Sequence, residues 1–479
     1  LPDEPAWYID GQILDEDYVY ASFLQSKMYE REVQCNDCHN VHSTQLLFEG
    51  NDLCLQCHQA ETYDNYNHHF HKKAGMPGEP VISESGVTFE VGSGTECINC
   101  HMHGRYYMGV DYRRDHSFRI PRPDLSIKHG TPNACNQCHI NESNQWADNY
   151  ITRWFGESRR YHYSEALAGA KNQKPGALDE LAAILENELY PPNIRSLALE
   201  KIGIYYQDSV SDLSEKYINH LNPSFRLSSI RSMHAPSERN IPILLNSLKD
   251  DIKAVRCEAV QRLMQIGEDR IPDDYLELYQ IVLKEYEQVL FFNADFPTGK
   301  VNLGNFYSRQ NKLHLAEKYY LSALEQDNEL YYIKLNLAYL YNRLNQNEKA
   351  EKLFRDYLKQ EPEDAETLYS LGLLLTEMGK YKESLSTLLN VVEMTPERPR
   401  VNHNIAMMYD FMKDKEKAEE YLKKEIEATA DLNSHMELMK FYIDNNQLEK
   451  ALEYGNKILE EYPEAGQVKQ AVEAISNRL

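Results

Sequence analysis

Cys35-Asn-Asp-Cys38-His39 is the first of four copies of one pattern, Cys-x-x-Cys-His, within residues 35–139. The other copies are Cys54–His58, Cys97–His101 and Cys135–His139. Two thiols at this spacing can add to the vinyl groups of one haem, and the histidine that follows can reach the iron. The four copies use eight of the nine cysteines, which chance does not explain. The repeat therefore predicts four covalently attached c-type haems.

Each copy supplies two attachment residues and one proximal iron ligand. The predicted attachment residues are Cys35, Cys38, Cys54, Cys57, Cys97, Cys100, Cys135 and Cys138, and the predicted proximal ligands are His39, His58, His101 and His139. The ninth cysteine, Cys257, lies in a helical pattern and is expected to face a core.

Further histidines are concentrated in the same region. Apart from the four motif histidines, eight histidines lie within residues 1–162, whereas five lie in the rest of the chain. This concentration favours ligands on the distal side of the irons over scattered surface residues. The preferred distal ligands are His42, His69, His71 and His116, with His68 left open beside His69. Ligation by Met76, Met102 or Met108 is also open and would raise the potential of that haem.

Four arginines form a basic cluster in an acidic chain. They are Arg113, Arg114, Arg119 and Arg122. The forked guanidinium suits carboxylates, so we expect these residues to pair with haem propionates, the alternative being ordinary surface charge.

The chain divides into three parts and predicts a mainly α fold. Residues 1–162 form a tetrahaem cytochrome domain, whose acidic and aromatic first 34 residues, including Trp7, Tyr18 and Tyr20, are expected to cover haem faces. Short helices are expected to carry the motifs, with haems in place of a side-chain core.

The remainder predicts an α-solenoid. In residues 163–270 the pairs Ile194-Arg195, Phe225-Arg226 and Val255-Arg256 recur about every 30 residues, which is typical of HEAT-like helix pairs. Residues 271–479 carry a period of about 34 residues with small and aromatic residues at fixed places, which predicts five tetratricopeptide units. A capping helix is expected from Glu464 onwards.

Charge and hydropathy limit the partners and the compartment. The formal net charge of −24 argues against binding nucleic acid and favours redox proteins with a basic docking patch. No apolar run long enough to span a membrane occurs. Covalent haem attachment takes place outside the cytoplasmic membrane in bacteria and archaea, and the chain begins at Leu1 without a leader. We therefore expect an exported protein, periplasmic or extracellular.

Four stretches of the haem region resemble a known family. They are Cys97–Met102, Tyr107–Asp111, Arg113–Ser126 and Gly130–Cys135. They are similar to the tetratricopeptide-repeat multihaem cytochromes, whose haem domain resembles the tetrahaem electron carrier of ammonia oxidisers. The resemblance implies closely packed haems, mostly with two histidine ligands, that pass electrons. In that carrier one haem lacks a sixth protein ligand. His103 departs from the family pattern, which has proline after Cys-His-Met.

Three functions are consistent with these features. The first is an electron carrier whose repeats bind redox partners or further copies of the chain, including assembly into an extracellular conductive filament. The alternative is a multihaem oxidoreductase that acts on a small nitrogen or sulfur compound at an open iron, which needs a free coordination position and nearby acid or base groups. The third is a scaffold with structural haems, which four haems in one small domain disfavour.

Overall fold

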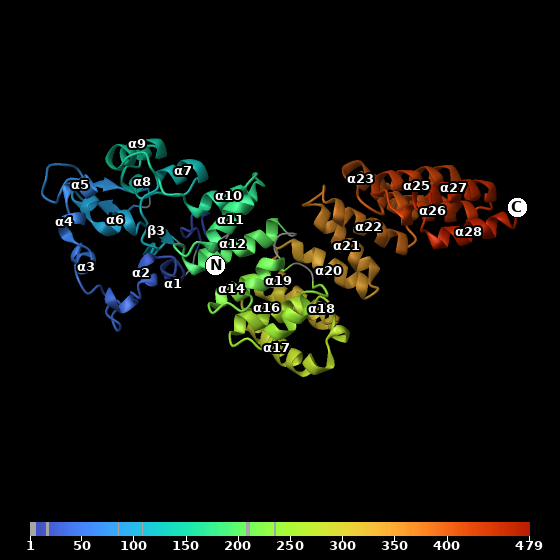
Figure 1. Ribbon diagram of the computed structural model, residues 1–479, viewed down its shortest axis with the longest axis horizontal. Helices are drawn as coiled ribbons and strands as arrows, with labels where there is room; N and C mark the ends of the chain where they lie inside the picture. Colours follow the sequence, from blue (N-terminus) through green and yellow to red (C-terminus); the bar gives the residue numbers. More distant parts are fainter. Residues whose placement is uncertain (1–5, 16–18, 85, 108, 207–210, 234–235) are drawn as a thin grey trace. The chain divides into compact units, whose positions relative to one another are not determined.

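The computed structural model describes residues 6–15, 19–84, 86–107, 109–206, 211–233 and 236–479 (Figure 1). The chain forms two compact units, residues 1–283 and 284–479. The first contains the predicted haem domain and the predicted HEAT-like segment, and the second contains the tetratricopeptide segment. The dividing point falls inside helix α17 (Asp273–Phe292), somewhat beyond the predicted boundary at residue 270. The fold is mainly α, as predicted.

Each Cys-x-x-Cys-His motif lies on or beside a helix of one turn or little more. These helices are η1 (Cys35–Asp37), α3 (Asp52–Leu55), α6 (Cys97–His101) and α8 (Cys135–Cys138). The other short helices nearby are α1 (Val19–Phe23), α2 (Lys27–Glu30), α4 (Ala60–Tyr63), α5 (Tyr66–His69), η2 (Ser93–Thr95) and α7 (Pro123–His129). Such helices are too short to be stable alone, because nucleation is costly and few hydrogen bonds follow it.

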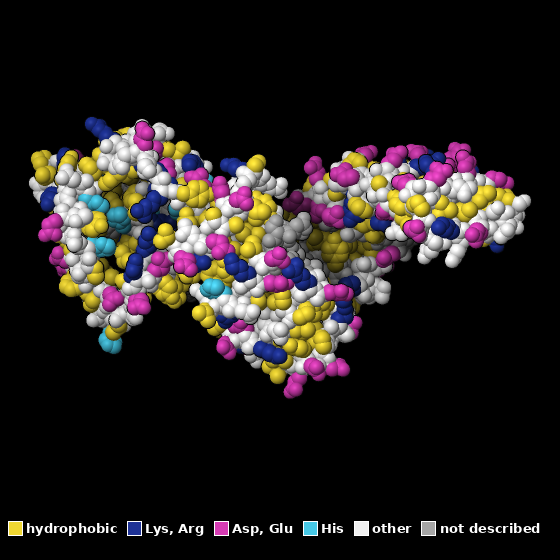
Figure 2. Space-filling view, in the orientation of Figure 1, with side chains coloured by type: hydrophobic (Ala, Val, Ile, Leu, Met, Phe, Trp, Pro, Cys, Tyr) yellow, Lys and Arg dark blue, Asp and Glu magenta, His cyan; other side chains and the backbone are white. Residues whose placement is uncertain are grey.

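Two hairpins and one longer helix complete this region. Strands β1 (Val81–Ile82) and β2 (Thr88–Phe89) pair antiparallel, as do β3 (Gly104–Tyr107) and β4 (Asp111–Arg114), with Gly104 opposite Arg114. Helix α9 (Asn144–Phe155) begins at Ser143, whose side chain accepts a hydrogen bond from the Trp146 N–H. Figure 2 shows histidine side chains gathered around a hollow in this region. A hollow lined by histidines is consistent with a core that includes cofactors.

Helix pairs follow between residues 163 and 270. They are α10 (Tyr163–Lys171), α11 (Ala177–Glu186), α12 (Pro192–Tyr205), α13 (Ser211–Tyr217), α14 (Pro223–Ser232), α15 (Ile241–Ser247) and α16 (Lys253–Leu263), then η4 (Glu268–Arg270). Helix α14 packs between α12 and α16. The repeated positions Ile194, Phe225 and Val255 are all buried. The residues that recur about every 30 positions thus lie in the core between the helices. The HEAT-like assignment stays a prediction.

The second unit consists of five further helix pairs and a last helix. The pairs are α18 (Pro297–Arg309) with α19 (Leu313–Gln326), α20 (Tyr332–Arg343) with α21 (Asn347–Leu358), α22 (Ala365–Glu377) with α23 (Tyr381–Met394), α24 (Val401–Phe411) with α25 (Lys415–Thr429), and α26 (Leu432–Asp444) with α27 (Leu448–Glu461). Helix α28 (Gly466–Ser476) buries Val468 and Ile475 against the last pair. These pairs match the five predicted units and the predicted cap.

Close approach within a pair explains why small residues recur. A Cβ at Gly304 would lie 2.4 Å from the ring of Tyr320, and one at Gly372 would lie 2.7 Å from Leu388. The corresponding Ala338 and Ala406 are completely buried. None of the described helices is long and apolar enough to cross a lipid bilayer.

Candidate metal centres

The four attachment motifs lie next to one another in chain order. We call them site 1 (Cys35–His39), site 2 (Cys54–His58), site 3 (Cys97–His101) and site 4 (Cys135–His139). The thiols of Cys54 and Cys97 hydrogen-bond to each other, which joins sites 2 and 3.

The thiols of other neighbouring sites lie near enough to affect each other's charge. Burial raises the pKa of Cys38, and Cys57 of site 2 adds to the rise. Burial, followed by the thiols of Cys135 and Cys138 of site 4, raises the pKa of Cys100 to about 12. Each site therefore has thiols of the next site in its surroundings.

Three of the predicted proximal histidines face a second imidazole. The ring centroids of His39 and His116 are 6.4 Å apart, and their planes differ by 29°. Those of His68 and His101 are 6.2 Å apart at 19°. Those of His71 and His139 are 6.2 Å apart at 39°.

These separations match two imidazoles on opposite sides of one metal ion. A bound imidazole nitrogen lies about 2 Å from a transition metal and the ring centroid about 1 Å further, so two such centroids are roughly 6 Å apart. Rings in direct van der Waals stacking would lie closer. The side chains at sites 1, 3 and 4 thus fit a haem iron between each pair.

Hydrogen bonds to the backbone orient several of these rings. Nδ1 of His39 lies 2.8 Å from the Thr44 carbonyl oxygen. Nδ1 of His101 lies 2.8 Å from the Arg119 carbonyl oxygen, and Nδ1 of His116 lies 2.9 Å from the Arg114 carbonyl oxygen. A carbonyl only accepts, so Nδ1 carries the proton and the Nε2 lone pair is left for a metal.

Burial favours the neutral imidazole, the form that metal ligation requires, at three of these histidines. It is the main cause that lowers the pKa of His101, His116 and His139 below the usual histidine value.

Site 2 differs from the other three. His58 is exposed, and in the described part of the chain the ring that contacts it is Tyr63, edge-on at 5.6 Å, and not a histidine. Tyr63 in turn lies edge-on against His68, 5.4 Å away. A tyrosine hydroxyl is a hydrogen-bond donor and a poor substitute for a second imidazole.

The predicted distal ligands are distributed unevenly. His116 and His71 face proximal histidines, whereas His69 does not: its Nδ1 accepts a hydrogen bond from the His71 N–H at 3.1 Å. His68 takes the place facing His101. His42 is exposed, and its backbone N–H donates to the Asn40 side chain at 3.0 Å. The methionine alternatives include Met108, which lies outside the described residues.

The end of α5 decides between His68 and His69. The helix ends at His69, and Phe70 adopts a left-handed conformation with φ of 55°. The turn separates His68 at site 3 from His71 at site 4. Nothing in residues 66–71 predicts where this turn falls. The sequence pattern could therefore identify the cluster of histidines but not which of them faces His101.

The predicted arginine cluster is engaged by protein groups. Arg114 donates from Nη1 to the Ile98 and Met102 carbonyl oxygens at 3.2 and 3.1 Å, which fastens β4 to the site 3 helix. Arg122 forms a two-point ion pair with Asp124, at 2.7 and 2.6 Å.

Arg119 contacts the N-terminal segment. Its Nη1 donates to the Asp10 carbonyl oxygen at 2.5 Å. These contacts give Arg114, Arg119 and Arg122 a role in holding the chain together, and their pairing with propionates stays a prediction. Arg113 pairs with Asp111 at 2.6 Å, and a propionate contact for it stays a prediction.

The aromatic residues of the N-terminal segment are divided between core and surface. Trp7 and Phe23 are buried, and Phe23 lies edge-on against Phe118 at 6.3 Å. Tyr20 is exposed, and Tyr18 lies outside the described residues. The segment thus packs on the region around His116, and its predicted covering of haem faces stays a prediction.

Family models match two separate parts of the chain. Residues 29–62 match the model of the doubled CXXCH motif, which indicates covalent c-type haem binding. Residues 301–365, 335–399 and 399–431 match tetratricopeptide repeat models, which confirms the predicted repeats over residues 301–431 and indicates a role in binding proteins. No curated protein matches the sequence. The resemblance to the electron carrier of ammonia oxidisers stays a prediction.

Solved structures that partly resemble the chain include MamA and a tetratricopeptide repeat protein. MamA from Desulfovibrio magneticus RS-1 is 20% identical, with a TM-score of 0.32 over 36% of this chain and 97% of its own. A tetratricopeptide repeat protein from Parabacteroides merdae ATCC 43184 is 23% identical, with a TM-score of 0.33 over 42% of this chain and 79% of its own.

Proposed function

We propose that this chain is an exported electron-transfer protein that carries four c-type haems, one at each of sites 1 to 4. The observation that carries this proposal is the set of three facing imidazole pairs. A haem supplies reversible one-electron chemistry at its iron. When imidazoles occupy both faces, no position is left for a substrate, and such a site serves electron transfer.

The proposed axial pairs are His39 with His116, His101 with His68, and His139 with His71. In each pair the proximal histidine belongs to the attachment motif and the distal one comes from elsewhere in the haem region. The distal ligand replaces long-range packing in holding two segments together, which suits a region built from short helices.

The nearness of successive sites supports transfer along the series. The thiols of each site affect the pKa of thiols at the next site in the sequence. Electron exchange falls steeply with separation, so this nearness favours transfer between neighbouring sites. The net charge of −24 favours a donor or acceptor with a basic docking surface.

The repeats would bind the redox partner or further copies of this chain. Stacked helix pairs present extended surfaces, which suits either role. If copies associate head to tail, the contacts build a filament whenever the rotation does not close. Electron microscopy of the purified protein tests this version, and discrete monomers under all conditions would count against it.

A second candidate function is favoured by site 2. Among the residues that the structure describes, His58 contacts the ring of Tyr63 and not that of a second histidine, so a haem there would have one free axial position. Such a position could bind a small nitrogen or sulfur compound, with the Tyr63 hydroxyl nearby as a donor. The chain would then be an oxidoreductase with one reactive and three electron-supplying sites.

Spectroscopy with added ligands separates the two candidates. We expect four haems per chain by iron analysis, with EPR showing three low-spin irons and one that responds to cyanide. All four should be reduced and reoxidised reversibly. Binding of nitrite or hydroxylamine without turnover supports the carrier. Sustained turnover supports the oxidoreductase, and haems that no donor reduces would refute both.

A further inference from the structure

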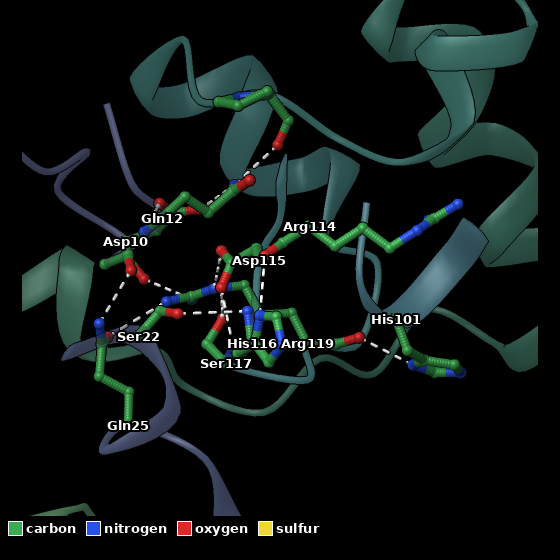
Figure 3. A network of polar contacts seen from close by, with 12 residues as sticks. Asp10, Gln12, Ser22, Gln25, His101, Arg114, Asp115, His116, Ser117 and Arg119 are labelled. Carbon is green, nitrogen blue, oxygen red and sulfur yellow. Dashed lines mark hydrogen bonds and ion pairs between the residues drawn. The ribbon is translucent and has the colours of Figure 1, made fainter. Parts of the chain in front are cut away.

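One short segment, residues 114–119, supplies backbone groups to imidazoles at two different sites (Figure 3). The Arg114 carbonyl oxygen accepts from Nδ1 of His116, the ring that faces site 1. The Arg119 carbonyl oxygen accepts from Nδ1 of His101, the proximal histidine of site 3, at 2.8 Å. The Arg119 N–H also donates to the His101 carbonyl oxygen at 2.9 Å. The two ends of this segment therefore each hold an imidazole of a different site.

The N-terminal residues hold the segment from the side away from the irons. The Arg119 side chain is largely buried, and it donates to the Asp10 carbonyl oxygen and, at 3.2 Å, to the Gln25 side chain. Tyr163 donates to the same Asp10 carbonyl at 2.5 Å. These contacts fix the position of the Arg119 side chain, and through it the position of the backbone that binds His101.

Ser22 makes a second and separate anchor. Its hydroxyl accepts from the His116 backbone N–H at 3.2 Å and donates to the Val19 carbonyl oxygen at 2.9 Å. Ser22 is fully buried, so its hydroxyl has these protein partners and does not depend on water. The Ser22 contact acts on site 1, whereas the Arg119 contact acts on site 3.

The close fit depends on a glycine. Gly11 has a φ of 80°, and a Cβ there would lie 2.2 Å from the Tyr163 hydroxyl and 2.9 Å from Nη2 of Arg119. No other residue would let the N-terminal segment approach Arg119 this closely.

We propose that Arg119 and Ser22 are positioning residues through which N-terminal residues 10–15 and 19–25 tune sites 1 and 3, leaving site 4 unaffected. The inference rests on the proposed function. A firm hydrogen bond from Nδ1–H to a carbonyl makes the imidazole a stronger electron donor to a metal. A stronger donor stabilises the oxidised iron and lowers its reduction potential. Loosening either anchor should therefore raise the potential of one site only.

The test compares Ser22→Ala, Arg119→Ala and Arg119→Lys with a matched control, Arg122→Lys. Arg122 contacts Asp124 and the Arg160 carbonyl and touches no axial histidine. EPR spectra and potentiometric titrations of the haem-loaded full chain are recorded, with signals assigned from variants of the distal histidines. Ser22→Ala should move the site 1 signal alone. Arg119→Ala should move the site 3 signal. At a fixed solution potential it should change the ratio of oxidised to reduced iron at site 3 about tenfold, which corresponds to a shift of about 59 mV in the reduction potential.

Arg119→Lys should recover part of the shift, since an ammonium can reach the Asp10 carbonyl but not Gln25 at the same time. Unchanged signals in Ser22→Ala and Arg119→Lys would overturn the proposal, as would equal shifts at sites 1, 3 and 4 or equal shifts in the Arg122→Lys control. If Arg119→Ala does not fold, the Ser22→Ala and Arg119→Lys results decide. Failure of the proposed function would appear instead in the wild type, as haems that are not reversibly reduced.

Discussion

The adjacent residues His68 and His69 provide the sharpest test of the proposed ligand pairs. The His68 ring faces His101 with centroids 6.2 Å apart and planes that differ by only 19°. The His69 ring lies edge-on against Tyr66 at 6.3 Å, and its Nδ1 is used by the His71 N–H. His68→Ala removes a proposed ligand of site 3, whereas His69→Ala is a neighbouring control with the same change in composition.

The magnitude follows from the number of facing pairs. Three proximal histidines face a second imidazole, so three irons are expected to be low-spin. His68→Ala should abolish one of them, and the low-spin EPR intensity should fall by about one third. Haem content should stay the same, since Cys97, Cys100 and His101 still hold the haem. His69→Ala should leave the low-spin intensity unchanged.

The assay is quantitative EPR of the oxidised protein, with iron and protein measured on the same samples. Added imidazole should enter the space left by the side chain in His68→Ala and restore the lost intensity. A loss in His69→Ala but not in His68→Ala would refute the pairing of His68 with His101. Loss of intensity without rescue, together with loss of haem, would show that His68 is needed for folding and not as a ligand.

Three further predictions concern residues outside the facing pairs. His42→Ala should leave the low-spin EPR intensity of the monomer unchanged, because His42 is exposed. A loss of low-spin intensity in this variant would instead support His42 as a distal ligand. Gly304→Ala should lower the free energy of unfolding in urea by about 1–3 kcal/mol, because the new Cβ would meet Tyr320. Gly466→Ala is the control, and it should change the free energy of unfolding by less than about 1 kcal/mol because a Cβ there meets open space. Burial alone would raise the pKa of Asp250, but hydrogen bonds from Arg226 and the Ile252 N–H hold it below its usual value. The ionised carboxylate then stabilises the fold fully above about pH 4, and this stabilisation is lost as the pH falls through the lowered pKa. The difference in free energy of unfolding between wild type and Asp250→Asn should therefore be constant near neutral pH and shrink in acid. A constant difference down to about pH 2 would contradict this.

Features that depend on local spacing were predictable. Cys-x-x-Cys-His places two thiols and an imidazole on one turn of chain, and the structure puts all four motifs on or beside short helices. The five repeat pairs were predictable for a similar reason. Each needs a small residue where two helices meet, as at Gly304 and Gly372, and the need recurs with a fixed period.

Partner choice between distant residues was predictable only in part. The crowding of histidines pointed to distal ligation, and His71 and His116 do face proximal histidines. The selection of His68 depends on where α5 ends. The contacts of Arg119 were not predictable from composition. A run of arginines near haem motifs suggested propionates, and only the folded chain shows Asp10 and Gln25 against its guanidinium.

The sequence by itself determined the attachment motifs, the mainly α fold and the succession of repeats. These follow from covalent chemistry and from periodic contacts between segments that are close in the chain, and each is written into a few consecutive residues. Only the tertiary structure decided which imidazoles face each other, which site lacks a partner, and that residues 114–119 serve two sites together. Those outcomes depend on the closing of long loops, where many histidines and arginines compete for each position and packing selects one.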